Sequence, residues 1–219
     1  QVNGTNITTG SAVMLPALAK KAANSGLSGA EFCIGIPGTV GGALQSNSGT
    51  TANSDMSTIV SRVTVLKNGQ LENYYHDDIV WGYRQTSLKS SGDIVIEARF
   101  GLVGKSNDAI HSNMRALLAS RKATQPTAEP NVGSVFKNPD GDYAGRLIEA
   151  AGCKGLGTKN ASVSKLHANF ITHNGNAGSN EIVYLITEMQ QKVQSSFGIR
   201  LSPEIEWWGS EAPPSCFDK

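Results

Sequence analysis

The sequence has 219 residues, 39% of them hydrophobic and 17% charged, with a formal net charge of +1 at pH 7. A chain of this length can build one large domain or two smaller ones around a sizeable core. Its balanced charge argues against nucleic-acid or membrane partners, and no apolar run approaches the roughly 20 residues that span a bilayer. We therefore expect a soluble globular protein.

The cysteines point to a reducing compartment. Cys33, Cys153 and Cys216 are odd in number and widely spaced, and they match neither a disulfide framework nor a zinc pattern. We expect reduced thiols in a cytoplasmic protein and no metal site.

The first half of the chain is predicted to be rich in β-structure with antiparallel hairpins. Residues 1–10 are weakly strand-like, and Pro16 begins a short helix that stops at Gly26. The segment 59–66 is predicted as a strand, and Asn68-Gly69 after it is a strong hairpin signal. A second strand is expected to bury one face of alternating apolar residues, namely Ile94, Ile96, Ala98, Phe100 and Leu102.

A glycine-rich segment interrupts this half of the chain. Its five glycines are Gly35, Gly38, Gly41, Gly42 and Gly49. Glycine accepts positive φ and lets another surface approach the backbone, and successive N–H groups in such turns form concave anion sites. The segment predicts either a loop against a phosphate-bearing cofactor or a tight crossover without a ligand, because its spacing matches neither the dinucleotide-binding turn nor the P-loop.

The second half is predicted to hold a smaller mixed domain. A helix follows Ser106-Asn107 and ends among Arg121 and Lys122, and residues 125–130 have the composition of a linker. The elements expected beyond this boundary are a short helix capped by Asp142 and ended by Gly152, a strand over 168–172, an amphipathic helix from Ser179 to Gly198, and a last strand over 201–208.

Five motifs occur in an order typical of one enzyme family. They are Gly35-Ile-Pro-Gly-Thr-Val-Gly-Gly-Ala43, Tyr83-Arg84, Gly133-Ser-Val-Phe-Lys-Asn-Pro139, Ala144-Gly-Arg-Leu-Ile-Glu-Ala-Ala-Gly152, and Ser164 through His167-Ala-Asn-Phe170, with Pro203-Glu204 as a further match. Over nearly its whole length the chain resembles the UDP-N-acetylenolpyruvoylglucosamine reductases, flavoenzymes that complete UDP-N-acetylmuramate in peptidoglycan synthesis. Small departures, such as Thr86 where serine is usual, are typical of a divergent member.

The resemblance implies an α+β fold with three parts. Residues 1–122 would be the remainder of a β-rich FAD-binding domain of the vanillyl-alcohol-oxidase type, and residues 123–200 a smaller α+β substrate-binding domain. The C-terminal strand and tail, residues 201–219, would return to the FAD domain. The implied cofactors are FAD and NADPH, and the implied substrate is UDP-N-acetylglucosamine enolpyruvate. We expect a monomer.

The resemblance also assigns the cofactor and substrate contacts. The substrate would contact Tyr83, Lys122 and Asn138, although a lysine at the position of Lys122 can also simply complement a helix dipole. The residues implied to lie against FAD are Gly35, Ile36, Pro37, Gly38, Thr39, Gly41, Gly42, Ala43, Asn47 and Gly49.

Three residues match the family's catalytic positions. Hydride addition to an enolpyruvyl ether leaves negative charge on the neighbouring carbon and its carboxylate, so the site needs a cation and a proton source. Arg84 can bind the carboxylate through its planar fork, and Ser134 is the implied proton donor.

Glu204 would approach the enolate, either protonated or paired with Arg84. Glu206 would share its strand face, so the pattern alone does not separate the two glutamates. Without the resemblance, the same residues would be a surface arginine, a turn serine and strand-edge glutamates. His167 is assigned no catalytic role.

In this family the FAD domain begins well upstream with another glycine-containing loop, which this sequence does not include. We therefore keep a second hypothesis, a remnant that binds the UDP-sugar but not FAD. A flavin-dependent oxidase of the broader superfamily is a third and more remote option.

Overall fold

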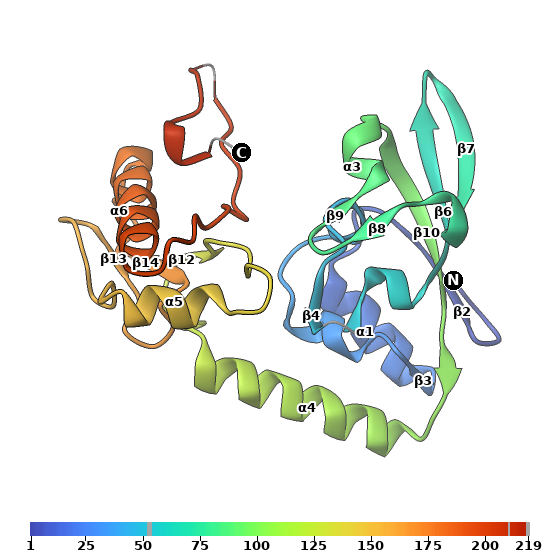
Figure 1. Ribbon diagram of the computed structural model, residues 1–219. Coiled ribbons are helices and arrows are strands. Elements are labelled where there is room, and N and C mark those ends of the chain that lie inside the picture. Colours follow the sequence, from blue (N-terminus) through green and yellow to red (C-terminus); the bar gives the residue numbers. More distant parts are fainter. Residues whose placement is uncertain (52–53, 210, 218–219) are drawn as a thin grey trace. The chain divides into compact units, whose positions relative to one another are not determined.

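The computed structural model describes residues 1–51, 54–209 and 211–217, without the side chain of Thr51. It divides into two compact units, Gln1–Ser120 and Arg121–Lys219, each with its own hydrophobic core. Both units combine helices with antiparallel sheets, so the chain is a mixed α and β protein (Figure 1).

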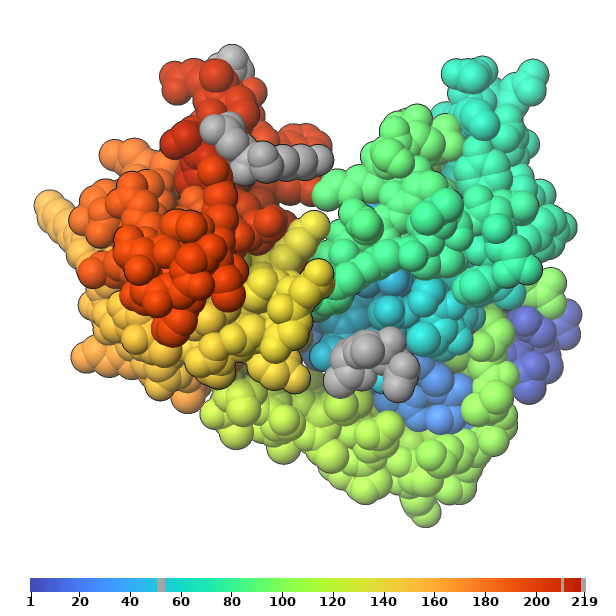
Figure 2. All heavy atoms as spheres, viewed as in Figure 1, coloured from blue at the N-terminus to red at the C-terminus, as the bar shows by residue number. Residues whose placement is uncertain are grey.

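A five-stranded antiparallel sheet with the order β1-β2-β10-β6-β7 organises the first unit. The strands of this sheet are β1 (Val2–Asn3), β2 (Asn6–Gly10), β6 (Val60–Lys67), β7 (Gln70–Tyr75) and β10 (Ile94–Gly101). Asn68-Gly69 joins β6 to β7 as predicted, with Asn68 at φ +49° and Gly69 at φ +81°. The tip of this hairpin projects from the rest of its unit (Figure 2).

Short elements complete the first unit. They are α1 (Leu15–Asn24), β3 (Leu27–Ser28), a 3-10 turn (Glu31–Gly35), α2 (Val40–Gln45), β4 (Gly49–Thr51), β5 (Ser54–Asp55), β8 (Trp81–Gly82), β9 (Gln85–Thr86), α3 (Ser87–Ser91) and β11 (Val103–Gly104). Pro16 lies in the first turn of α1, and Gly26 follows the helix with φ +66°, as the sequence predicts. Leu15 and Leu18 of α1 belong to the same core as Val63, Val65 and Phe100 of the sheet.

The prediction of which face of β10 is buried is only partly correct. Ala98, Phe100 and the following Leu102 are buried, but Ile94 and Ile96 are 60% and 40% exposed. The pairing with β6 slips between Val95 and Glu97, so Val95 points inward instead. A bulge of this kind moves the residues before it to the opposite face of the sheet, because side chains alternate with a period of two.

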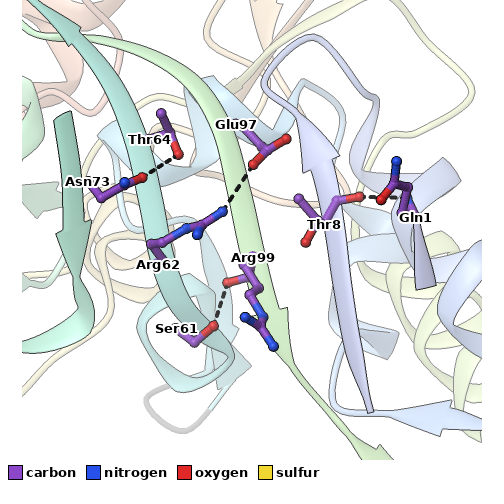
Figure 3. Close-up of polar contacts among 8 residues, drawn as sticks. All are labelled: Gln1, Thr8, Ser61, Arg62, Thr64, Asn73, Glu97 and Arg99. Atoms are coloured by element: carbon purple, nitrogen blue, oxygen red, sulfur yellow. Dashed lines mark hydrogen bonds and ion pairs between the residues drawn. The ribbon is translucent and has the colours of Figure 1, made fainter. Parts of the chain in front are cut away.

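Polar pairs link neighbouring strands of this sheet (Figure 3). Arg62 Nη2 lies 3.2 Å from Glu97 Oε1, and Thr64 Oγ1 donates to Asn73 Oδ1 at 2.8 Å. These residues come from three adjacent strands, so the pairs reinforce the observed register.

The second unit packs two helices with a three-stranded sheet of order β12-β14-β13. Its elements are β12 (Asn131–Ser134), α5 (Ala144–Ala150), β13 (Ala161–Val163), β14 (Phe170–His173) and α6 (Ser179–Phe197). Gly198 ends α6 in the left-handed conformation, as predicted. Asp142 does not cap α5; the N-cap residue is Tyr143, and the amide of Ala144 at the helix start donates to Asn138 Oδ1 at 3.0 Å.

The expected domain boundary after residue 122 lies close to the observed division, but the expected last strand is missing. The helix after Ser106 is α4 (Asn107–Thr124), and the compact units divide within it, after Ser120. The strand expected over 201–208 does not form; the described residues there make only an isolated bridge between Phe136 and Pro203. Leu201 and Cys216 lie in the second core, so the structure groups the tail with the second unit.

Candidate functional site

The glycine-rich segment forms a turn and a short helix against the start of the chain. The amides of Val40 and Gly41 donate to Val13 O and Ser11 O at 2.9 and 2.8 Å. Those of Gly42 and Ala43 donate to the side chain and main chain of Thr39. Four successive N–H groups are therefore engaged within the chain, which is the arrangement expected for a tight crossover.

The open part of this segment is the Pro37-Gly38-Thr39 turn. Pro37 and Gly38 are exposed, Gly38 has φ +125°, and a Cβ added to it would meet nothing within 4 Å. The amides of Gly38 and Thr39 donate to no acceptor among the described residues. Two adjacent donors at an open glycine can receive an anionic ligand, because backbone N–H groups in such turns act as fixed partial positive charges.

Two other glycines are required by close packing within the chain. A Cβ on Gly49 would lie 2.4 Å from Asp55 Cβ, and one on Gly41 would lie 3.0 Å from Ser11 Cβ. These glycines are explained without a ligand.

Arg84 is held at the tip of a tight hairpin formed by β8 and β9. Tyr83 and Arg84 are the two turn residues, since Trp81 pairs with Thr86 and Gly82 with Gln85. Arg84 has φ +55°, a conformation that costs a non-glycine residue roughly 1 kcal/mol or more. Its Nη2 donates to Gly49 O at 2.9 Å, and its guanidinium lies 5.2 Å from the centre of the Tyr83 ring.

Asn47 ties the glycine-rich segment to this hairpin. Its Nδ2 donates to Gly82 O at 3.1 Å and to Asp55 Oδ2 at 3.3 Å, and its Oδ1 accepts from the Ser57 amide at 3.0 Å. The residue is buried, so its side chain supports the hairpin that carries Arg84.

Thr86 has a supporting role that sequence reasoning missed. Its hydroxyl lies 3.1 Å from Leu44 O and 3.0 Å from Gln45 O, at the end of α2. The sequence marked Thr86 only as a departure from the family, and no local pattern indicates a contact 42 residues away.

Ser134 is the last residue of β12 and follows a break in the regular pairing of that strand with β14. Gly133 has φ +77°, its amide donates to Asn131 Oδ1 at 2.9 Å, and the pairing with β14 slips between Asn131 and Ser134. Ser134 is half-buried, and its hydroxyl makes no hydrogen bond to another described residue. The hydroxyl is therefore available to a ligand.

The structure brings the backbone segments that carry Ser134 and Glu204 next to each other. The amide of Glu204 donates to Val135 O at 2.8 Å, and the amide of Lys137 donates to Ser202 O at 2.9 Å. The expected shared strand face with Glu206 is absent because no strand forms there. Glu206 is exposed, and its carboxylate accepts from Trp208 Nε1 at 3.3 Å.

The remaining predicted residues are less central. Asn138 Oδ1 accepts from the Ala144 amide, so this side chain caps α5, and Lys122 is exposed near the end of α4. Burial lowers the pKa of His167, and its Nδ1 accepts from the Asn169 amide at 3.2 Å. This histidine is part of a structural turn.

The predicted residues thus form two groups, one in each unit. The glycine-rich segment, Asn47 and the Arg84 hairpin are joined in the first unit, and Ser134 and Glu204 in the second. Convergence of Arg84 with Ser134 and Glu204 stays a prediction.

Other features of the described residues do not add a site of this kind. A polar cleft of about 380 Å³ in the second unit, between Lys159, His173 and Glu129, includes none of the predicted residues. The described residues contain no cluster of three or more metal-ligating side chains. No helix in the described part of the chain is long and apolar enough to cross a membrane. All three cysteines are buried thiols.

Comparison with known proteins decides the family. Residues 125–208 match the model of the UDP-N-acetylenolpyruvoylglucosamine reductase C-terminal domain. The chain is 42% identical over 209 residues to UDP-N-acetylenolpyruvoylglucosamine reductase 2 of Symbiobacterium thermophilum, covering 95% of this chain and 68% of the relative. The chain belongs to the UDP-N-acetylenolpyruvoylglucosamine reductase family.

Two further reductases agree with this assignment. The Desulforamulus reducens reductase is 40% identical, with 96% of this chain and 69% of the relative aligned. The crystal structure of the Thermus caldophilus reductase superposes with a TM-score of 0.83 at 34% identity, covering 95% of this chain and 75% of that one. The chain spans about two thirds of the length of these sequence relatives.

Membership in the reductase family places the chain among oxidoreductases. The matched C-terminal domain includes both Ser134 and Glu204, the two residues that the structure joins through Val135.

Proposed function

We propose that this protein reduces UDP-N-acetylglucosamine enolpyruvate to UDP-N-acetylmuramate, using FAD and NADPH. The observation that carries the proposal is the hydrogen bond from the Glu204 amide to Val135 O, the residue next to Ser134. It supports a role for both residues in one site, because their backbone segments are adjacent although they are far apart in sequence. The reductase relatives, at about 40% identity over most of the chain, support the same reaction.

The chain offers residues that fit a bound flavin nucleotide. The two unengaged amides at Gly38 and Thr39 would receive its diphosphate, with Gly38 leaving room for close approach. Gly41, Gly42, Ala43, Asn47 and Gly49 would shape the supporting wall, because their polar contacts are made within the chain. A flavin held there would supply hydride transfer from NADPH to the enolpyruvyl group.

Side chains of the protein would stabilise the negative charge that develops on the substrate and would supply the proton. The Arg84 guanidinium would bind the substrate carboxylate, where negative charge develops. The Ser134 hydroxyl would deliver a proton to the carbon next to the one that receives hydride, and Glu204 would approach the enolate. Tyr83, Lys122 and Asn138 would contact the UDP-sugar.

The proposed function is tested by FAD binding, by substrate-dependent oxidation of NADPH and by removal of the Ser134 hydroxyl. We expect the purified protein to hold FAD as a yellow chromophore and to oxidise NADPH when the enolpyruvyl substrate is added. Ser134→Ala should lower turnover by roughly 100- to 10,000-fold, the span of a general acid, while leaving the flavin spectrum unchanged. Ser162→Ala, a half-buried serine of the same sheet, is the matched control.

Near-normal turnover in Ser134→Ala would remove this serine from the mechanism. Binding of the UDP-sugar without FAD would favour the non-catalytic remnant. Oxygen consumption without NADPH would instead favour the oxidase.

A further inference from the structure

Asn169 is a buried polar residue in a turn that the proposed reaction does not use. It is 5% exposed and lies just before β14, in the motif His167-Ala-Asn-Phe170. The turn is rigidly closed: Ser164 N donates to Phe170 O at 2.8 Å, and Asn169 N donates to His167 Nδ1 at 3.2 Å.

The Asn169 side chain binds both polar groups of one peptide residue. Its Oδ1 accepts from Phe136 N at 2.9 Å, and its Nδ2 donates to Phe136 O at 2.8 Å. Its main-chain O accepts from Val135 N at 2.9 Å. Asn169 thus continues the β12–β14 pairing by one residue with its side chain.

Residues 202–204 lie along the opposite edge of the segment 135–137. Val135 O accepts from Glu204 N, Lys137 N donates to Ser202 O, and Phe136 bridges Pro203. Residues 135–137 are therefore held between Asn169 on one side and the 202–204 segment on the other, with Ser134 at their start.

We propose that Asn169 is a positioning residue for the Ser134 and Glu204 pair, an inference that rests on the proposed function. Phe136 is 1% exposed, so without Asn169 its N–H and C=O would be buried without partners. Without the Asn169 side chain, residues 135–137 would shift until Phe136 N–H and C=O found other partners. That shift would move Ser134 and Glu204 away from the reacting carbon. Asn169 therefore acts only on the step in which hydride and proton reach the substrate.

The variant Asn169→Leu tests this assignment, because leucine has a similar volume and no hydrogen-bonding groups. In stopped-flow measurements on the FAD-loaded protein, reduction of flavin by NADPH should keep the wild-type rate. Reoxidation by the enolpyruvyl substrate should slow by roughly 100-fold, the effect of a misplacement of about 1 Å. A merely destabilised protein would lose amplitude in both half-reactions equally, in proportion to its unfolded fraction, but its folded molecules would keep both wild-type rates.

Glu181→Ala serves as the matched control, because Glu181 pins residues 158–160 of the same unit and touches neither Ser134 nor Glu204. It should lower stability but leave both half-reactions at their wild-type rates. A folded Asn169→Leu protein with normal substrate-dependent reoxidation would overturn the inference.

A second measurement separates this inference from the proposed function. Amide hydrogen exchange at Phe136 and Glu204 should be at least tenfold faster in Asn169→Leu than in Glu181→Ala, whether or not the protein binds FAD. If the wild type lacks activity, the proposed function fails, and unchanged exchange at these two amides would still refute the positioning role.

Discussion

Two non-glycine residues beside the glycine-rich segment adopt the left-handed backbone conformation. Asn47 has φ +42° and Arg84 has φ +55°. Such positions usually carry glycine, and a side chain there persists when the surrounding structure uses it. Both side chains are used: Asn47 binds Gly82 O, and Arg84 binds Gly49 O.

At Asn47, backbone strain and lost hydrogen bonds can be separated by two variants. Asn47→Gly keeps the backbone conformation but removes the side-chain bonds, and should lower the free energy of unfolding by roughly 1–3 kcal/mol. Asn47→Ala adds left-handed strain, so it should lose about 1 kcal/mol more. Urea unfolding measures both values, and an alanine variant as stable as the glycine variant would contradict the role of φ.

At the scale of elements, α6 depends on one carboxylate in its first turn. Glu181 accepts from Thr158 Oγ1 at 2.7 Å, from both nitrogens of Asn160, and from Gly178 N. These hydrogen bonds, that of Thr158 first, lower the pKa of Glu181 from 4.5 to about 2. The charged carboxylate therefore joins the helix start to the loop before β13.

This lowered pKa predicts an acid-dependent loss of stability. Because the folded pKa lies below the unfolded one, the stabilisation is fully present above pH 4.5 and is lost as the pH falls to about 2. The difference in free energy of unfolding between wild type and Glu181→Gln should shrink over that window. Urea unfolding at several pH values checks it.

Asp142 also has a pKa lowered to about 2, through its hydrogen bond with Arg146. Because this pair is the same in wild type and Glu181→Gln, its titration cancels in the difference between the two free energies of unfolding. A difference that stays constant from pH 6 to pH 2 would show that the charge of Glu181 does not stabilise the loop.

At the scale of the whole molecule, two separate cores predict two regions of stability. Met56 is fully buried in the first core and Met189 in the second. Replacing a buried methionine with alanine costs roughly 2–5 kcal/mol.

Met189→Ala should therefore accelerate amide exchange mainly in residues 121–217, and Met56→Ala mainly in residues 1–120. Hydrogen exchange read by mass spectrometry distinguishes the two patterns. If either variant accelerated exchange equally throughout, the chain would unfold as one cooperative unit.

What the sequence determined by itself was mostly local. The α1 and α6 helices, their glycine stops and the Asn68-Gly69 hairpin follow from apolar periodicity and from glycine's access to positive φ. The ordered motifs were also sufficient to identify the family, because motif order is a property of the chain alone.

Only the tertiary structure decided the features that depend on distant partners. The bulge that turns Ile96 outward, the missing strand at residues 201–208 and the place of the tail in the second core arise from pairing and packing across the chain. The supporting roles of Asn47, Thr86 and Asn169 are of the same kind. Their hydrogen bonds join residues that are more than 30 positions apart, and no periodicity in the sequence encodes such a contact.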